Sequence, residues 1–353
     1  MLKSLKRAAF TASKHTGLLR LVSRTAWRRN RLLILGYHGV SLEDEHVWRP
    51  GLYLSPDVLE ARFELLRRER CAVLPLSEAL RLLKAGKLPE RSVALTFDDG
   101  FSDFHKNAWP LLSSFGFPAT VYLTTYYCRK RLPVFEITCR YLLWKARGRK
   151  LTAHWIRSGD RPSFDLSAEA GLAAAMDSLL TFASDAGLSG AEKGELTARV
   201  AESLGIDYAA FLEKRILQIM SPAEVTELSA RGVDFQLHTH RHCMPEVKAD
   251  FLREIEENRR AIAEMTGNNP VHFCYPSGEF ADQFLPWLAE SGVVSATTCI
   301  PGTASQSGEP LKFPRLLDSS NLAPIEFEAW LGGIGALIPR RRGTGAPPHR
   351  SEA

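Results

Sequence analysis

The sequence predicts a parallel α/β fold of the barrel type, interrupted once by a helical insertion. Apolar, strand-like runs alternate with helical stretches along most of the 353 residues, a rhythm typical of repeated β-α-β units. The polar residues that suggest chemistry come directly after some of these runs. Because active sites of (β/α) barrels lie at the C-terminal ends of the strands, both observations favour one barrel-like domain.

The predicted elements follow one another in strand and helix order. Before the insertion we expect strands at 32–37, 71–74, 92–97 and 118–123, with helices at 56–69, 76–84 and 103–114. After the insertion we expect strands at 233–237, 271–275 and 293–298, with helices at 248–266 and 281–291. Apolar runs of this length, bounded by turn residues, are typical of buried parallel strands.

Residues from about 127 to 220 break the alternation with helix-forming sequence, and two helices are expected at 168–184 and 191–204. Beside a site, such an insertion forms a lid or a platform for substrate. It could equally be decoration, and the sequence leaves both readings open.

Two adjacent carboxylates end the strand that begins at Ser92: Asp98 and Asp99 precede a turn at Gly100. Neighbouring carboxylates repel one another and raise each other's pKa, so a bound cation or a proton-transfer task best explains them. The plainer alternative is a turn after a strand, because Asp and Gly both favour turns.

Two histidines, His238 and His242, lie four positions apart after the strand at 233–237. This spacing lets both imidazoles reach one metal ion. One Asp and two His leave a position open for water, and a second carboxylate can take that water's proton. A polar loop is the alternative, and His240 is expected to be a neighbour of the site and not a ligand. The pattern indicates metal-assisted hydrolysis.

These motifs resemble those of a known family. Thr96 to Gly100 and His238 to His242 are similar to the first two motifs of the polysaccharide deacetylases, also called the NodB-homology domain or carbohydrate esterase family 4. Phe273 to Gly278 is similar to a variant of the family's third motif. The resemblance covers residues 32–335 and implies a distorted or incomplete (β/α) barrel with a helical insertion.

The resemblance implies a role for each matched residue. Asp98 corresponds to the catalytic base, Asp99 to the metal-binding aspartate, and His238 and His242 to the two metal-binding histidines. A divalent metal, zinc before cobalt, nickel or manganese, would activate water and polarise an acyl carbonyl, most often that of an N-acetyl amino sugar. The main-chain N–H at Ser277 corresponds to the oxyanion donor.

Two family features are missing from their usual positions. Cys274 stands where an arginine usually tethers the catalytic base, and a cysteine cannot make a bidentate contact with a carboxylate. The family's general-acid histidine lies near the C-terminal end of the domain, but the only histidine after residue 290 is His349.

Two replacements are predicted. Tyr37 and His38 are similar to the opening motif of a subgroup with permuted motif order, which makes His38 the expected general acid. Arg315 is expected to replace the lost tether. The alternatives are a His38 that hydrogen-bonds a backbone carbonyl and an Arg315 in a plain surface salt bridge.

The first 31 residues are expected to form a basic N-terminal arm. Between Met1 and Leu42 there are nine Lys and Arg residues and no acidic one; with a formal net charge of +5 overall, the remainder is acidic on balance. The arm has no apolar run long enough for a signal-peptide core or a membrane span. Its apolar residues are interleaved with cations, so it either lies on an anionic membrane surface or packs on the domain. Nucleic-acid binding is a poorer fit, since no recognition motif appears.

The cysteines and the C-terminal tail bear on location and order. Six cysteines without a C-x-x-C pair argue against a disulfide scaffold and suit a reducing compartment. We therefore expect a cytoplasmic protein, with peripheral contact at the inner membrane surface through the arm. Residues 336–353 are expected to be disordered.

These predictions converge on a metal-dependent hydrolase with a carbohydrate substrate. It would remove an N-acetyl or other acyl group from an amino sugar of a polysaccharide or lipid-linked glycan, as in exopolysaccharide biosynthesis, by cleaving a C–N amide bond that is not a peptide bond. A deformylase or amidase acting on a non-polymer substrate would keep the same metal chemistry. A glycan-binding protein that has lost catalysis is the alternative from another class, although such a protein would not need Asp98.

Overall fold

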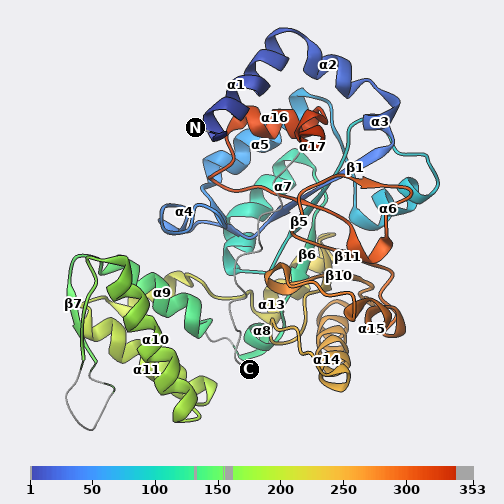
Figure 1. The fold of residues 1–353 in the computed structure, drawn as a ribbon. Coiled ribbons are helices and arrows are strands. Elements are labelled where there is room, and N and C mark those ends of the chain that lie inside the picture. Colours follow the sequence, from blue (N-terminus) through green and yellow to red (C-terminus); the bar gives the residue numbers. More distant parts are fainter. Residues whose placement is uncertain (1, 131–132, 154, 156–161, 339–353) are drawn as a thin grey trace.

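A curled, mostly parallel sheet of nine strands forms the centre of the fold, and helices cover its outer side (Figure 1). The structure is a computed structural model that describes residues 2–130, 133–153, 155 and 162–338. The predicted class, a distorted (β/α) barrel with a helical insertion, is confirmed.

Seven strands form the main path of the sheet in the order β11-β10-β9-β6-β5-β1-β12, while β4 pairs with β5 and β13 with β1. Every pairing is parallel except that of β1 with β12. The strands are β1 (Arg31–Tyr37), β4 (Ala72–Val73), β5 (Ser92–Phe97), β6 (Thr120–Leu123), β9 (Asp234–Leu237), β10 (His272–Cys274), β11 (Ser295–Thr297), β12 (Ala304–Ser305) and β13 (Leu316–Leu317). Two short pairs lie apart: β2 (Gly39–Val40) with β3 (Tyr53–Leu54), and β7 (Lys150–Thr152) with β8 (Ser163–Asp165).

The segment 313–317 completes the ring of strands. Phe313 bridges Thr297 of β11 in parallel fashion, and β13 pairs with the C-terminal half of β1. Since β13 is only two residues long, its sequence carries no strand-like run, and our sequence analysis did not predict it. Arg315 directly precedes β13 and is fully buried inside the barrel.

Twelve helical elements cover the barrel or fill its loops within the described residues. Five predicted helices appear among them, at 56–69, 76–84, 103–114, 248–266 and 281–291, with shifts of no more than three residues at their ends. The full set is α4 (Glu45–Trp48), α5 (Pro56–Arg68), α6 (Leu76–Lys84), η1 (Phe104–Ala108) continuing into α7 (Trp109–Phe115), α13 (Pro222–Ala230), α14 (Lys248–Thr266), η2 (Pro276–Gly278), α15 (Phe284–Glu290), η3 (Pro310–Lys312), α16 (Pro324–Leu331) and the short helix α17 (Ile334–Leu337).

Local sequence explains where these helices begin and which side they bury. In α5, the Ser55 hydroxyl accepts a hydrogen bond from the Val58 N–H and Pro56 occupies the first turn, an arrangement that favours a helix start. Leu59, Phe63 and Leu66 follow at helical spacing and are all buried, so this face packs on the sheet.

The insertion forms a separate helical layer with a core of its own, seen in green at the lower left of Figure 1. Buried residues from three of its helices, including Leu142, Leu179 and Val200, pack together. The insertion comprises α8 (Tyr126–Lys130), α9 (Phe135–Lys145), α10 (Glu169–Asp185), α11 (Gly190–Ser203) and α12 (Tyr208–Lys214). The two helices predicted here correspond to α10 and α11.

The N-terminal arm folds as α1 (Leu2–His15), α2 (Leu18–Ser23) and α3 (Ala26–Arg29), which lie over α16 and α17 (Figure 1). None of the described helices is long and apolar enough to cross a membrane. At the other end, residues 336 and 337 of the predicted disordered tail belong to α17, which is a correction; the tail from 339 on, including His349, lies outside the described residues.

Candidate active site

The turn after β5 points its two aspartates in different directions. Asp99 (φ +67°) and Gly100 (φ +80°) both adopt the left-handed conformation, and a Cβ at Gly100 would lie 2.4 Å from the Leu123 Cδ1 atom. Only glycine fits there without displacing Leu123. The Asp98 N–H donates to the Tyr37 carbonyl at the end of β1, which fixes the turn to the neighbouring strand.

Arg315 holds Asp98 with a two-pronged contact inside the barrel. Its Nη1 and Nη2 atoms donate to Asp98 Oδ1 and Oδ2, each over 2.7 Å, and both residues are buried, with exposed fractions of 0% and 1%. Further hydrogen bonds run from Nη1 to Thr96 Oγ1 and from Nε to the Thr298 carbonyl. Burial alone would raise the pKa of Asp98, but the charge and hydrogen bonds of Arg315 outweigh it and keep the pKa below its usual value. Asp98 is therefore an ionised carboxylate of fixed orientation.

Two small residues make room for this guanidinium. A Cβ at Gly36 would lie 3.3 Å from Arg315 Cζ. Cys274 is buried, and its sulfur lies 3.0 Å from Arg315 Nη2. Burial raises the pKa of the Cys274 thiol well above its ordinary value, so this residue is no nucleophile. Cys274, at the position where the family's tethering arginine is expected, thus contacts Arg315 instead.

His38 lies on the open side of the same carboxylate. Its Nε2 atom is 3.7 Å from Asp98 Oδ2, and the side chain keeps part of its surface exposed. Burial lowers the pKa of His38, while Asp98 and Asp99 act in the opposite direction. The imidazole therefore faces Asp98, and within the described residues it makes no hydrogen bond to a backbone carbonyl, as the plainer alternative would require.

Asp99, His238 and His242 converge on one point, with their candidate ligand atoms all within 4.8 Å of one another. The Nε2 atoms of His238 and His242 lie 3.2 and 3.1 Å from Asp99 Oδ1. Because His238 Nδ1 lies 2.9 Å from the Cys274 carbonyl, which can only accept, Nδ1 carries the hydrogen and Nε2 points a lone pair at the carboxylate.

The electrostatics of this cluster fit a cation. Asp99 Oδ1 is buried and receives no well-directed hydrogen bond from the described part of the chain. A carboxylate and an imidazole lone pair facing each other at this distance repel unless a positive charge lies between them. The donor set, one carboxylate and two imidazoles, is typical of a catalytic metal site with an open position.

Asn258 supports the metal-site loop, and our sequence analysis missed it. From α14, its Oδ1 accepts the His238 N–H, while Nδ2 donates to the Leu123 carbonyl and to Thr125 Oγ1. The signal was present in the sequence, because Asn258 shares one helical face with the buried apolar residues Phe251 and Ile255. A polar residue in such a stripe needs buried partners.

Two other histidines of the sequence stay outside the ligand set. His240 Nδ1 pairs with Thr125 Oγ1 at 2.8 Å, as a neighbour of the site. His272 is held between Ser77 Oγ and Ser295 Oγ, each 2.8 Å away, and is structural.

Ser277 lies in the loop that follows β10, three residues after the carbonyl that orients His238. Its backbone is left-handed (φ +55°), as is that of Gly278 (φ +70°). The Ser277 N–H donates to no acceptor among the residues that the structure describes. Consecutive backbone N–H groups in such a turn form a concave surface that favours anions.

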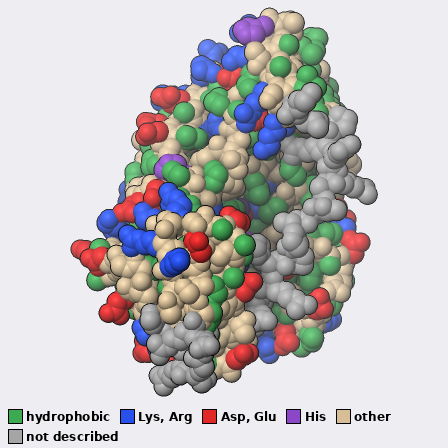
Figure 2. Space-filling model, turned by 60° about the vertical axis from the view of Figure 1, so that its left-hand side comes forward, with side chains coloured by type: hydrophobic (Ala, Val, Ile, Leu, Met, Phe, Trp, Pro, Cys, Tyr) green, Lys and Arg blue, Asp and Glu red, His purple; other side chains and the backbone are tan. Residues whose placement is uncertain are grey.

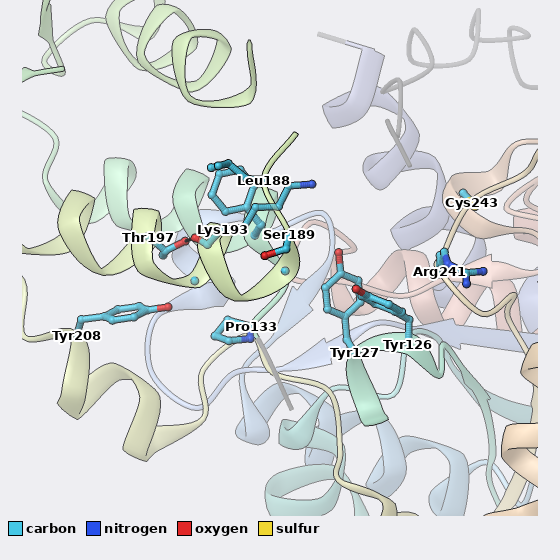
Figure 3. A pocket seen from close by; sticks show the side chains of 13 residues that line it. Tyr126, Tyr127, Pro133, Leu188, Ser189, Lys193, Thr197, Tyr208, Arg241 and Cys243 are labelled. Atoms are coloured by element: carbon cyan, nitrogen blue, oxygen red, sulfur yellow. Dashed lines mark hydrogen bonds between the residues drawn. The ribbon is translucent and has the colours of Figure 1, made fainter. Parts of the chain in front are cut away.

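A groove leads from the metal-site loop to the insertion. A cavity of about 940 Å³ is lined by His242 and Arg241 on one side and by residues of α9, α10 and α11 on the other, with Tyr127 between them. A neighbouring cavity of about 300 Å³ shares Tyr127 and Arg241 and adds Tyr126 and Tyr208. Figure 3 shows the two adjacent tyrosines of α8 between Arg241 and the α10–α11 connection. The insertion therefore forms one wall of the approach to the site.

Comparison with known proteins identifies the family. The family model described as polysaccharide deacetylase matches residues 85–152 and 181–296, more than half of the chain. The chain belongs to the polysaccharide deacetylase family. The matched ranges include Asp98, Asp99, His238 and His242, whereas His38 and Arg315 lie outside them. The expected family is confirmed, while the expected domain limits, residues 32 and 335, stay a prediction.

Related sequences and structures agree with this placement. The chain is similar to the poly-β-1,6-N-acetyl-D-glucosamine N-deacetylase of Escherichia coli K12, with 30% identity over 28% of this chain and 15% of the relative. The enzyme of the same name from Staphylococcus aureus MSSA476 is 35% identical over 20% of this chain and 25% of the relative. The chain thus matches a quarter or less of each relative's length.

Two solved structures share the fold of this chain. Streptococcus pyogenes deacetylase PplD in complex with acetate aligns with a TM-score of 0.56 and 18% identity, over 88% of this chain and 99% of that one. IcaB from Ammonifex degensii aligns with a TM-score of 0.51 and 15% identity, over 87% and 97% of the two chains.

Proposed function

We propose that this polysaccharide deacetylase is a metal-dependent enzyme that removes the N-acetyl group from an amino sugar of a glycan. One observation carries the proposal: a buried, arginine-held carboxylate lies directly beside an Asp-His-His cluster at the end of a groove. A divalent metal, zinc by preference, held by Asp99, His238 and His242 would polarise the acyl carbonyl and activate water.

Asp98 is suited to accept the proton of the attacking water. It is ionised and next in sequence to Asp99, and Arg315 fixes both of its oxygens, so little reorientation is needed. The new C–O bond forms at the acyl carbon, and the Ser277 N–H is the proposed donor to the developing oxyanion. An N–H without a partner in the described chain is free for this task.

His38 is the proposed donor of a proton to the leaving amine. Cleavage of the C–N bond needs a proton on nitrogen, because an amide anion is a very poor leaving group. With Nε2 3.7 Å from Asp98 Oδ2, His38 lies close enough to receive the proton that Asp98 has taken from water. The products are acetate and a free amino sugar, and both carboxylate and imidazole return to their starting states.

The substrate class is inferred from the groove and from the relatives. Aromatic side chains such as Tyr127 and Phe135 line the cavity that reaches His242, and flat apolar rings suit the apolar faces of sugars. The related enzymes from E. coli and S. aureus are named for a polymer of N-acetylglucosamine. We therefore propose a polymeric or lipid-linked N-acetylated glycan. The cytoplasmic location stays a prediction, as does the absence of nucleic-acid binding.

The alternatives keep part of this chemistry. A deformylase or amidase would use the same residues on a smaller substrate, but no described feature favours it over a glycan. A binding protein without catalysis would not need the Asp98–Arg315 contact. Because Arg315 restores the tether that Cys274 cannot provide, the structure gives this alternative less support than the sequence did.

Metal content and acetate release together test the proposal. The purified chain would be measured beside Asp99→Ala and His238→Ala, with His240→Gln as the matched control, since His240 lies in the same loop without joining the cluster. The substrates would be N-acetylglucosamine oligomers. We expect bound metal and acetate release in the parent and the control, and loss of both in the two variants. Bound metal without acetate release would indicate a substrate other than these oligomers. A parent chain without bound metal would overturn the proposal.

A further inference from the structure

The N-terminal arm has an inner face that is firmly attached to the barrel. Phe10 is buried in a small cluster with Ala329 and Ile334. Along the same side, Arg7 pairs with Glu326 and Lys14 with Glu328. The arm is thus fixed in place with a defined outer surface.

The end of the arm is fixed as firmly as its beginning. The buried Arg28 donates from Nε to the Leu331 carbonyl at 2.9 Å and from Nη1 to the Arg31 carbonyl at 2.8 Å. A Cβ at Gly332 would lie 2.4 Å from Leu19 Cδ1, so the contact with α16 is close. The outer surface of α1 and α2 is therefore a permanent surface of the folded chain.

That outer surface is apolar at helical spacing. Leu5, Ala8, Ala9 and Ala12 are all exposed on α1, and the spacing of three, four and seven residues places them on one stripe. Leu5 has an exposed fraction of 72%. An amphipathic helix normally packs its apolar stripe against the protein. In α1 the opposite side, with Arg7, Phe10 and Lys14, packs against α16, and this stripe stays exposed.

The short helix α2 also exposes large apolar side chains. Leu18 and Leu21 have exposed fractions of 48% and 66%. Exposure of large apolar side chains to water is unfavourable, and a group of them on one surface is typical of an interaction site.

The arm also carries exposed cations without partners in the described part of the chain, and two of them, Arg20 and Arg24, lie within three residues of Leu21. Lys3, Arg20 and Arg24 make no ion pair within the described residues, and no acidic residue occurs before Glu43. The upper end of Figure 2, where the arm lies, shows Lys and Arg side chains close to hydrophobic ones. Cations that flank exposed leucines are suited to a surface that is negative at its boundary and apolar just below it.

We infer that α1 and α2 form a docking surface for an anionic lipid bilayer. The leucines would enter the boundary between headgroups and acyl chains, while Lys3, Arg20 and Arg24 would contact the headgroups. A nucleic acid would use the cations but not the leucines. The arm lies at the end of the molecule away from the insertion (Figure 1), so docking through it would leave the groove open to a glycan.

Sedimentation with vesicles tests this inference independently of any enzymatic activity. The full chain would be mixed with vesicles of phosphatidylcholine alone or of phosphatidylcholine and phosphatidylglycerol in equal parts. Two triple variants would be compared with the parent chain: Leu5→Ser, Leu18→Ser, Leu21→Ser, and Lys3→Glu, Arg20→Glu, Arg24→Glu. The matched charge control is Lys87→Glu, Lys150→Glu, Arg199→Glu, three exposed cations outside the arm that also lack ion pairs within the described residues.

We expect binding to the anionic vesicles only, a loss of at least tenfold in affinity in both arm variants, and parent-like binding in the control. Circular dichroism should show that all variants are folded, because every substituted side chain is exposed. Equal binding of all chains, or none by the parent, would overturn the inference. A leucine-to-serine variant that binds like the parent would also overturn the inference, because charge alone would then account for binding. Competition by DNA would overturn it as well, by identifying a general site for polyanions.

Discussion

Replacing Arg315 with methionine is the sharpest test of the site. Arg315→Met removes the charge but keeps an apolar chain of similar length in a cavity that is closed to solvent. It leaves Asp98, with an exposed fraction of 1%, without its two hydrogen bonds and its counter-charge. Breaking one partner of a buried ion pair costs about 3–5 kcal/mol. We expect the free energy of unfolding to fall by that amount at neutral pH.

The same change should remove the base. Without Arg315, the raising effect of burial meets less opposition and the pKa of Asp98 rises, so the carboxylate is less readily ionised and is no longer held in one orientation. Since general base catalysis contributes about 10²–10⁴-fold, acetate release should fall by at least a hundredfold even where the chain is fully folded. Chemical denaturation followed by circular dichroism measures the first effect, and kcat/KM on N-acetylated oligomers measures the second.

A second buried pair provides the control. Arg62 donates to both oxygens of Asp318, and both residues are buried. Arg62→Met should lower stability to a similar extent while kcat/KM of the folded enzyme stays within a few-fold. In the Asp98→Asn background, Arg315→Met should cost much less stability, because no buried carboxylate remains unpaired. Unchanged kcat/KM in folded Arg315→Met, or an equal stability cost in both backgrounds, would refute the reasoning.

Three further predictions follow from the same geometry. His38→Ala should lower kcat on an amide by about a hundredfold or more but affect an activated acetyl ester much less, because its leaving group needs no proton; equal losses on both substrates would contradict the acid role. Asp99→Ala and His242→Ala should each lose bound metal, measured by atomic emission, while circular dichroism stays unchanged; a variant that keeps stoichiometric metal is not missing a ligand. Burial, with the charge of Glu45 next, raises the pKa of Asp103 from its ordinary 3.8 to about 8, so the folded chain holds a proton that the unfolded chain releases, and stability should fall as the pH rises from 4 to 8. Asp103→Asn should flatten that fall in denaturation curves measured across this range, and an unchanged slope would show that Asp103 does not cause it.

The parts of the site that the sequence predicted are the local ones. Asp98 and Asp99 follow a buried strand and precede a glycine, and His238 and His242 lie four positions apart. Strand ends and short spacings are visible in the sequence because the chain itself sets these distances. Asn258 was visible in principle, as a polar residue in an apolar helical stripe.

The fold class was predictable for a similar reason. Burial on both faces makes the parallel strands continuously apolar, and β5 is buried at all six positions. The two-residue β13 was not predictable, because so short an element carries no periodic signal. The resemblance led us to propose Arg315, but only the closure of the barrel by β13 brings it to a carboxylate 217 residues earlier in the chain.

The sequence by itself determined the strand and helix order, the family and the chemical types of the candidate ligands, because each of these depends on residues that are close together in the chain. Tertiary structure alone decided that Arg315 reaches both oxygens of Asp98, that the insertion lines a groove ending at His242, and which side of the basic arm faces solvent. These depend on contacts between segments far apart in the chain, whose geometry is set by the packing of the whole barrel and not by the sequence around any one residue.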